Sequence, residues 1–142
     1  MARKKGSSDL MKRTDDQSVT ISVPNNPSYL RVIRLVVASV AAELGYDYEE
    51  IEDLRIVADE VAYLVMHQAS VRGKVHLTTS QEIGALTLHV TSAVADGGVR
   101  PEFDPVSRQV VSALTVQVKL GVTNGECEAI VRCHPPARLA SD

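Results

Sequence analysis

The chain has few aromatic residues and few cysteines. Aromatic residues make up 4% of its 142 residues, and tryptophan is absent. A hydrophobic core must therefore be built mainly from valine, leucine, isoleucine and alanine. If one strand carries both cysteines, Cys127 and Cys133, they lie about 20 Å apart, too far to form a disulfide or share a metal ion. We expect both to be buried as small hydrophobic residues.

Long apolar runs and an excess of positive charge are also missing. No run reaches the roughly 18–20 apolar residues of a membrane-spanning helix. The basic N-terminus lacks the apolar segment of a secretory signal. We therefore expect a cytoplasmic protein with no membrane partner. The formal net charge is −3, which argues against direct binding to DNA.

The hydrophobic spacing predicts one strand, two helices and then mostly strands. Asn26 and Pro27 are typical of a helix start and Gly45 of a helix end, so we predict a helix over Pro27–Leu44. A second apolar stripe predicts a helix from Asp47 to about Ala69. Alternating residues before and after the Asn-Gly pair at 124–125 predict a hairpin. We also expect a hairpin connection at 81–84 and a short helix within 106–116.

These elements predict an α+β fold. It is a two-layer α/β sandwich, a mostly antiparallel sheet with helices on one face. We expect an N-terminal tail over residues 1–17, one folded domain over 18–134 and a C-terminal tail over 135–142. The tail prediction rests on polar composition without periodicity.

Three segments resemble the anti-sigma-factor serine kinases of the RsbW and SpoIIAB type, within the GHKL ATPase superfamily. They are NPSYLRVIRLVVASVAAELG, EIEDLRIVADEV and the strand–loop sequence that ends in ADGG. The resemblance covers about residues 18–134 and is nearest to the divergent actinobacterial members. It implies a GHKL or Bergerat-like fold.

The resemblance also implies a nucleotide site, of which the chain keeps only parts. In the family, a glutamate on the second helix assists phosphoryl transfer, and an asparagine four residues later holds magnesium. Glu60 matches the glutamate, but Leu64 stands at the asparagine position. Asp96 and Gly98 match the adenine-binding Asp-x-Gly-x-Gly loop, whereas Arg100 replaces its second glycine. Turn chemistry alone also explains this loop.

The family's glycine-rich phosphate lid corresponds to residues 104–118. The chain has no glycine between Asp104 and Leu120, so few backbone N–H groups are free to surround phosphate. We therefore interpret Glu60 as a vestigial catalytic residue, and expect no cofactor. Binding of ATP and magnesium is the alternative.

The sequence gives little support for a serine nucleophile or a metal site. Ser107 and Ser112 have no histidine at a spacing that would activate a nucleophile. The four histidines show no metal-ligand spacing, so we predict no metal site.

The resemblance implies protein partners instead. In the family, an arginine near the start of the first helix contacts the sigma factor; Arg31 matches it, and Arg34 lies one turn further on the same face. The alternative is that both are ordinary exposed arginines, either free or paired with a carboxylate. The leading hypothesis is an anti-sigma factor that sequesters a sigma factor and is released by a STAS-type anti-anti-sigma partner. An active serine kinase acting on that partner, and a non-catalytic homodimeric interaction module, are the other two hypotheses.

Overall fold

The computed structural model describes residues 17–69, 72–94 and 101–140. Within these residues one five-stranded sheet has the order β1-β2-β3-β5-β4, and every neighbouring pair is antiparallel. The strands are β1 (Val19–Pro24), β2 (Lys74–Glu82), β3 (Ala85–Ala93), β4 (Thr115–Thr123) and β5 (Glu126–Cys133). The helices are η1 (Pro27–Tyr29), α2 (Leu30–Leu44), α3 (Tyr48–Gln68), α4 (Pro105–Leu114) and α5 (Ala137–Ala140).

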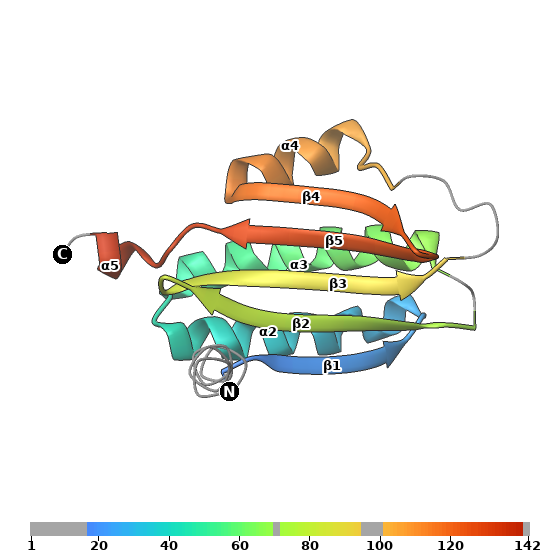
Figure 1. Cartoon of the computed structure of the whole chain (residues 1–142). Coiled ribbons are helices and arrows are strands. Elements are labelled where there is room, and N and C mark those ends of the chain that lie inside the picture. The colour runs from blue at the N-terminus through green and yellow to red at the C-terminus, as the bar shows by residue number, and fades with distance from the viewer. Residues whose placement is uncertain (1–16, 70–71, 95–100, 141–142) are drawn as a thin grey trace, which may run out of the picture.

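The helices α2 and α3 lie against one face of the sheet, and α4 runs beside the edge strand β4 (Figure 1). The register brings inward-facing residues of the three central strands side by side: Leu77 pairs with Val90, which pairs with Ala129. All three are at most 1% exposed, and together with α2 and α3 they form the core. The predicted α+β sandwich is therefore confirmed. None of the described helices is both long and apolar enough to cross a bilayer.

Both cysteines are buried and unpaired, as predicted. Burial raises the pKa of the Cys127 thiol to about 11 and that of Cys133 to about 12. Since the thiolate is the reactive form, neither sulfur is activated as a nucleophile.

The helix starts follow the sequence signals closely. The Asn26 side chain accepts a hydrogen bond from Ser28 N, and Pro27 opens the predicted helix, but its first turn is a 3₁₀ turn and α-helix begins only at Leu30. The second helix has a complete capping box: Asp47 accepts from Glu50 N, and the Glu50 side chain accepts from Asp47 N. Both caps satisfy backbone donors that the first helical turn leaves unpaired.

The C-terminal residues contact the end of the helical layer. The Arg138 guanidinium donates to the carbonyls of Leu44 and Gly45, the last two residues of the α2 terminus. Gly45 has φ +91°, and a Cβ atom there would overlap the Arg138 guanidinium. Glycine is therefore required at this position for two reasons: the helix ends in a left-handed conformation, and the Arg138 guanidinium occupies the space of a Cβ atom. Part of the predicted C-terminal tail thus forms α5 and its contacts.

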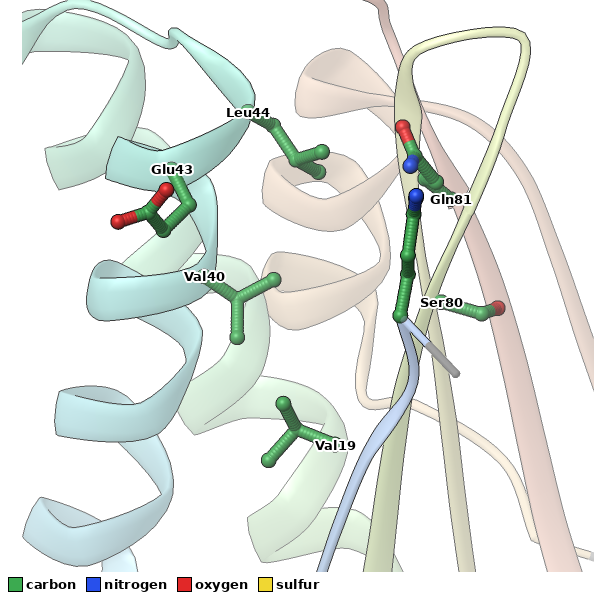
Figure 2. A pocket seen from close by; sticks show the side chains of 7 residues that line it. Val19, Val40, Glu43, Leu44, Ser80 and Gln81 are labelled. Carbon is green, nitrogen blue, oxygen red and sulfur yellow. The ribbon is translucent and has the colours of Figure 1, made fainter. Parts of the chain in front are cut away.

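The first strand begins beside a groove. Val19 is 39% exposed. It lines a groove of about 330 Å³ whose other apolar residues are Val40 and Leu44. Figure 2 shows Val40 and Leu44 on α2 facing Val19 across this groove. Val19 is exposed because it is the first residue of the edge strand β1.

Two hairpin turns provide a matched pair for a stability prediction. Ile83 and Gly84 connect β2 to β3 with φ values of 54° and 78°, and Asn124 and Gly125 connect β4 to β5 with 52° and 77°. Such turns favour Asn-Gly, whereas a β-branched residue with positive φ is strained. Ile83 is also 94% exposed, so its side chain contributes little packing.

We expect Ile83→Asn to raise the free energy of unfolding by about 1 kcal/mol, because asparagine tolerates the left-handed conformation. Urea unfolding of the variant and the wild type measures this change. The reciprocal variant Asn124→Ile should lose a similar amount. Equal stability of all three chains would contradict the strain at Ile83.

Candidate functional site

Glu60 lies at a small cavity between α3 and the start of α4. The cavity has a volume of about 250 Å³ and is lined by Glu60, Tyr63, Leu64, His67, Glu102, Phe103, Asp104 and Ser107. The Ser107 hydroxyl lies 2.6 Å from Glu60 Oε2 and 2.9 Å from Asp104 Oδ2. Because a hydroxyl carries one proton, it donates to one of these carboxylates at a time. Ser107 therefore links α4 to the carboxylate that the sequence singled out.

Asp104 is placed by the local sequence. It is the N-cap of α4, and its Oδ1 accepts from Ser107 N at 2.9 Å, with Pro105 at the helix start. This backbone hydrogen bond, and then the one from the Ser107 hydroxyl, lower the pKa of Asp104. The carboxylate is thus ionised at neutral pH and stabilises the N-terminus of α4.

These residues fit a magnesium-bound nucleotide poorly. Leu64 is 8% exposed and apolar, so the position one turn after Glu60 offers no metal ligand. The segment that corresponds to the phosphate lid forms the regular elements α4 and β4 instead of a glycine-rich loop. Over the described ranges, no group of three acidic, histidine or cysteine side chains could hold a metal ion. The cavity is also smaller than the 300–1,000 Å³ usual for ligand pockets.

Asp96 and Gly98, the two residues that match the adenine-binding loop, lie outside the described residues. Their role stays a prediction from the sequence. Ser112, in contrast, is exposed on α4 and has no part in the cavity.

The two arginines of the first helix lie in different surroundings. Arg34 Nη1 is 2.5 Å from Asp59 Oδ1, so this ion pair joins α2 to α3. Arg31 is exposed, and its Nε donates to the backbone carbonyl of Ser28 at 3.3 Å. Among the described residues, no carboxylate lies within salt-bridge distance of Arg31. The alternative of an arginine paired with a carboxylate therefore holds for Arg34 but not for Arg31.

Asp59, the partner of Arg34, and Ser107, the partner of Glu60, were not predicted as site residues. Asp59 is next to Glu60 in the sequence, but its pairing with Arg34 depends on how α2 packs on α3. The Asp-Pro pair at 104–105 is a helix-start signal that puts Ser107 in the first turn. Only the packing of α4 on α3 brings that turn to Glu60.

The contact between α3 and α4 can be tested by a double-mutant cycle. We expect Ser107→Ala and Glu60→Ala each to lower the free energy of unfolding by about 1 kcal/mol, and the double variant to cost less than their sum. Chemical denaturation measures all four chains. Ser112→Ala on the same helix is the matched control and should change stability by less than about 0.5 kcal/mol. Strict additivity would contradict a direct hydrogen bond.

Comparisons with known proteins agree with this architecture. No protein-family model matches the chain. The chain is 34% identical over 94 residues to the serine-protein kinase RsbW of Bacillus subtilis, covering 66% of this chain and 58% of the relative. It is 31% identical over 99 residues to RsbW of Bacillus licheniformis, covering 70% of this chain and 60% of the relative.

A solved structure has a similar fold. The crystal structure of the RsbU and RsbW domains of Rv1364c from Mycobacterium tuberculosis matches with a TM-score of 0.62 at 16% identity. The match covers 84% of this chain and 33% of that chain. At this identity the likeness concerns the fold alone. In sequence the chain resembles the RsbW-type family, and its fold agrees with that resemblance.

The resemblance predicted from the sequence is thereby confirmed. This RsbW-type chain spans 58% and 60% of the lengths of the two Bacillus relatives. Which activities of a longer RsbW protein this chain could share must therefore be argued from the residues of this chain. Arg31, Arg34 and Glu60 lie within its described α2 and α3.

Proposed function

We propose that the chain is a cytoplasmic anti-sigma factor. It binds an RNA polymerase sigma factor through the start of α2, and so keeps the sigma factor from the polymerase core. A STAS-type anti-anti-sigma partner releases it. Similarity to the RsbW proteins of Bacillus supports the general role, and the residues at the two candidate sites support binding over catalysis.

The observation that carries the proposal is the contrast between Arg31 and Glu60. Arg31 is exposed, and no carboxylate of the described residues pairs with it. Glu60 already accepts a hydrogen bond from Ser107, and the residue one turn later is a buried leucine. An exposed arginine is a frequent energetic centre of protein interfaces, whereas among the described residues Glu60 belongs to no group that could hold a metal ion and lies beside the regular helix α4.

The proposal is tested with the purified chain and the purified sigma factors of its source organism. We expect one of them to bind with submicromolar affinity, and a large excess of polymerase core to displace the chain. The matching STAS protein should release the sigma factor. If no sigma factor binds, the proposal fails. A dimer on size-exclusion chromatography that binds none would favour the interaction-module hypothesis.

A serine kinase acting on the STAS partner is the second candidate. It is supported by the name of the Bacillus relatives, serine-protein kinase, and by a carboxylate, Glu60, at a cavity. Calorimetry with ATP and magnesium separates the two candidates. We expect no heat of binding at millimolar ATP. A saturable signal, together with phosphate transfer to the STAS partner that Glu60→Gln abolishes, would establish the kinase instead.

A further inference from the structure

The groove beside the start of β1 is apolar and large enough to hold side chains. Its volume of about 330 Å³ equals that of about eleven water molecules and lies in the range usual for binding pockets. Val19, Val40 and Leu44 face one another across it (Figure 2). An apolar occupant would remove these side chains from water, which is the main favourable contribution to association.

One side of this groove is a strand edge that has room for another segment. The pairing of β1 with β2 starts at Val19 and Thr79, whereas β2 continues to Glu82. Ser80 and Gln81, which line the groove, pair with β3 on their other side. Within the described residues, no strand lies next to them on the β1 side. Such an edge leaves backbone donors and acceptors available to an added segment.

Glu43 gives the rim of the groove a negative charge. It is an exposed residue of α2 that lines the groove together with Val40 and Leu44. Among the described residues, no arginine, lysine or histidine side chain lies within salt-bridge distance of Glu43. A cation placed there would make a charge-assisted hydrogen bond. The groove therefore suits a segment that carries apolar side chains and a positive charge close together.

The sequence just before the groove contains such a segment. Gln17 lines the groove, so the residues that precede it are attached at the groove itself. Leu10 and Met11 are the only large apolar residues between positions 2 and 17, and two cations, Lys12 and Arg13, follow them directly. These four residues lie outside the described ranges. A chain from Met11 to Gln17 spans at most about 20 Å, which keeps the apolar pair within reach of the groove.

Attachment to the same chain favours this segment over a separate molecule. A segment on a short linker has an effective concentration at its site on the order of millimolar. A second copy of the chain could offer the same residues only at the additional cost of association. We propose that Leu10 and Met11 dock into the groove of their own chain, with Lys12 or Arg13 facing Glu43. The inference does not rest on the proposed function, because it uses no residue of the two candidate sites.

Thermal unfolding of the complete chain tests this docking. We expect Leu10→Ser/Met11→Ser to lower the unfolding midpoint by about 4 °C, although it changes no contact among the described residues. The groove variant Val19→Thr/Val40→Thr keeps the branched shape of both side chains and makes the groove polar. In that background, the same two serine substitutions should lower the midpoint by less than about 1 °C. Equal losses in the two backgrounds would overturn the proposal.

The charges are tested by a matched pair of reversals in the same part of the chain. Lys12→Glu/Arg13→Glu should lower the midpoint by about 2 °C at low salt and by less in about 1 M salt, where the interaction is screened. Lys4→Glu/Lys5→Glu makes the same change of charge further from the groove and should leave the midpoint unchanged. An equal loss in both pairs would make the effect one of net charge and would overturn the contact with Glu43.

A spin label locates the segment directly. The two native cysteines are buried, so a nitroxide reagent modifies only the new cysteine of Ser8→Cys. We expect the label to broaden the amide signal of Leu44 strongly. The signal of Asn124 should broaden much less, because the β4–β5 turn lies at the opposite end of the sheet (Figure 1). The difference should disappear when the two serine substitutions at positions 10 and 11 are added.

Two results would give the groove another occupant and overturn the proposal. A wild-type midpoint that falls on about hundredfold dilution, with broadening of Leu44 by a label on a separate chain, would assign the segment to a second copy. An unchanged midpoint in Leu10→Ser/Met11→Ser, with equal broadening of Leu44 and Asn124, would leave the groove to a different molecule.

Discussion

Reversing the charge of Arg31 should nearly abolish sigma-factor binding. We expect Arg31→Glu to weaken it by about 100-fold or more, because truncating a central interface arginine costs 2 kcal/mol or more and the new carboxylate adds repulsion. Within the described residues no carboxylate depends on Arg31 for pairing, so its replacement should leave the fold intact. Surface plasmon resonance with immobilised sigma factor measures the affinity.

The control is an equal change of charge elsewhere. Lys119 is exposed on the edge strand β4, and Lys119→Glu alters the net charge by the same amount. We expect its affinity to stay within about threefold of the wild type at physiological salt, where exposed charges beyond about 8 Å are screened. If Lys119→Glu were as weak as Arg31→Glu, net charge and not a specific contact would govern binding. Unchanged affinity in Arg31→Glu would contradict the docking role.

Removing the hydroxyl of Tyr46 should cost about 2–3 kcal/mol of unfolding free energy. Tyr46 is 7% exposed, and its hydroxyl donates to His134 O at 2.6 Å and accepts from Leu86 N at 2.9 Å. It thus joins the α2–α3 connection to β3 and to the residue after β5. Tyr46→Phe leaves both backbone groups without this partner, and one of them, Leu86 N, belongs to a residue that is fully buried.

The same contact predicts a dependence on alkaline pH. Burial raises the pKa of Tyr46 from 10.0 to about 12, so the folded state disfavours the phenolate relative to the unfolded chain. The resulting stability is complete below pH 10 and is lost as the pH rises towards 12. We expect the advantage of the wild type over Tyr46→Phe to shrink by about 1 kcal/mol between pH 8 and pH 11.

Urea unfolding of both chains at pH 8, 10 and 11 measures this difference. Taking the difference removes the contribution of other groups that titrate in the range, including the two cysteines. A constant difference across the range would show that Tyr46 ionises equally well in both states. An exposed tyrosine provides the control: Tyr48 is 78% exposed, and Tyr48→Phe should differ little from the wild type at any of these pH values.

Much of the fold could be predicted from the sequence because its signals are local. Asn26, Asp47 and Gly45 mark helix ends through hydrogen bonds and backbone angles that involve only near neighbours. The Asn-Gly pair at 124–125 sets its hairpin in the same way. A hairpin connection at 81–84 was also expected from the sequence. The left-handed conformation of Ile83 was not, since isoleucine contradicts the residue preference of such a turn. The pairing of β2 with β3 holds Ile83 in a conformation that its side chain disfavours.

The candidate site was only partly predictable. Glu60 and Leu64 could be compared because they lie one helical turn apart on one element. Ser107 could not be assigned to Glu60, since the two residues meet only when α4 packs on α3. For the same reason Arg31 and Arg34 are equivalent in the sequence and differ in the structure, where Asp59 neutralises one of them.

The sequence by itself determined the helices, the hairpins, the α+β class and the resemblance to the RsbW-type family, because short-range hydrogen bonds, hydrophobic periodicity and motif spacing carry that information. It also determined that Leu64 stands where a metal ligand would be needed. The tertiary structure decided which charges are already paired: Arg34 with Asp59, and the Glu60 carboxylate with the Ser107 hydroxyl. Such pairing depends on side chains from separate elements meeting at a few ångströms, and no spacing along one chain specifies that.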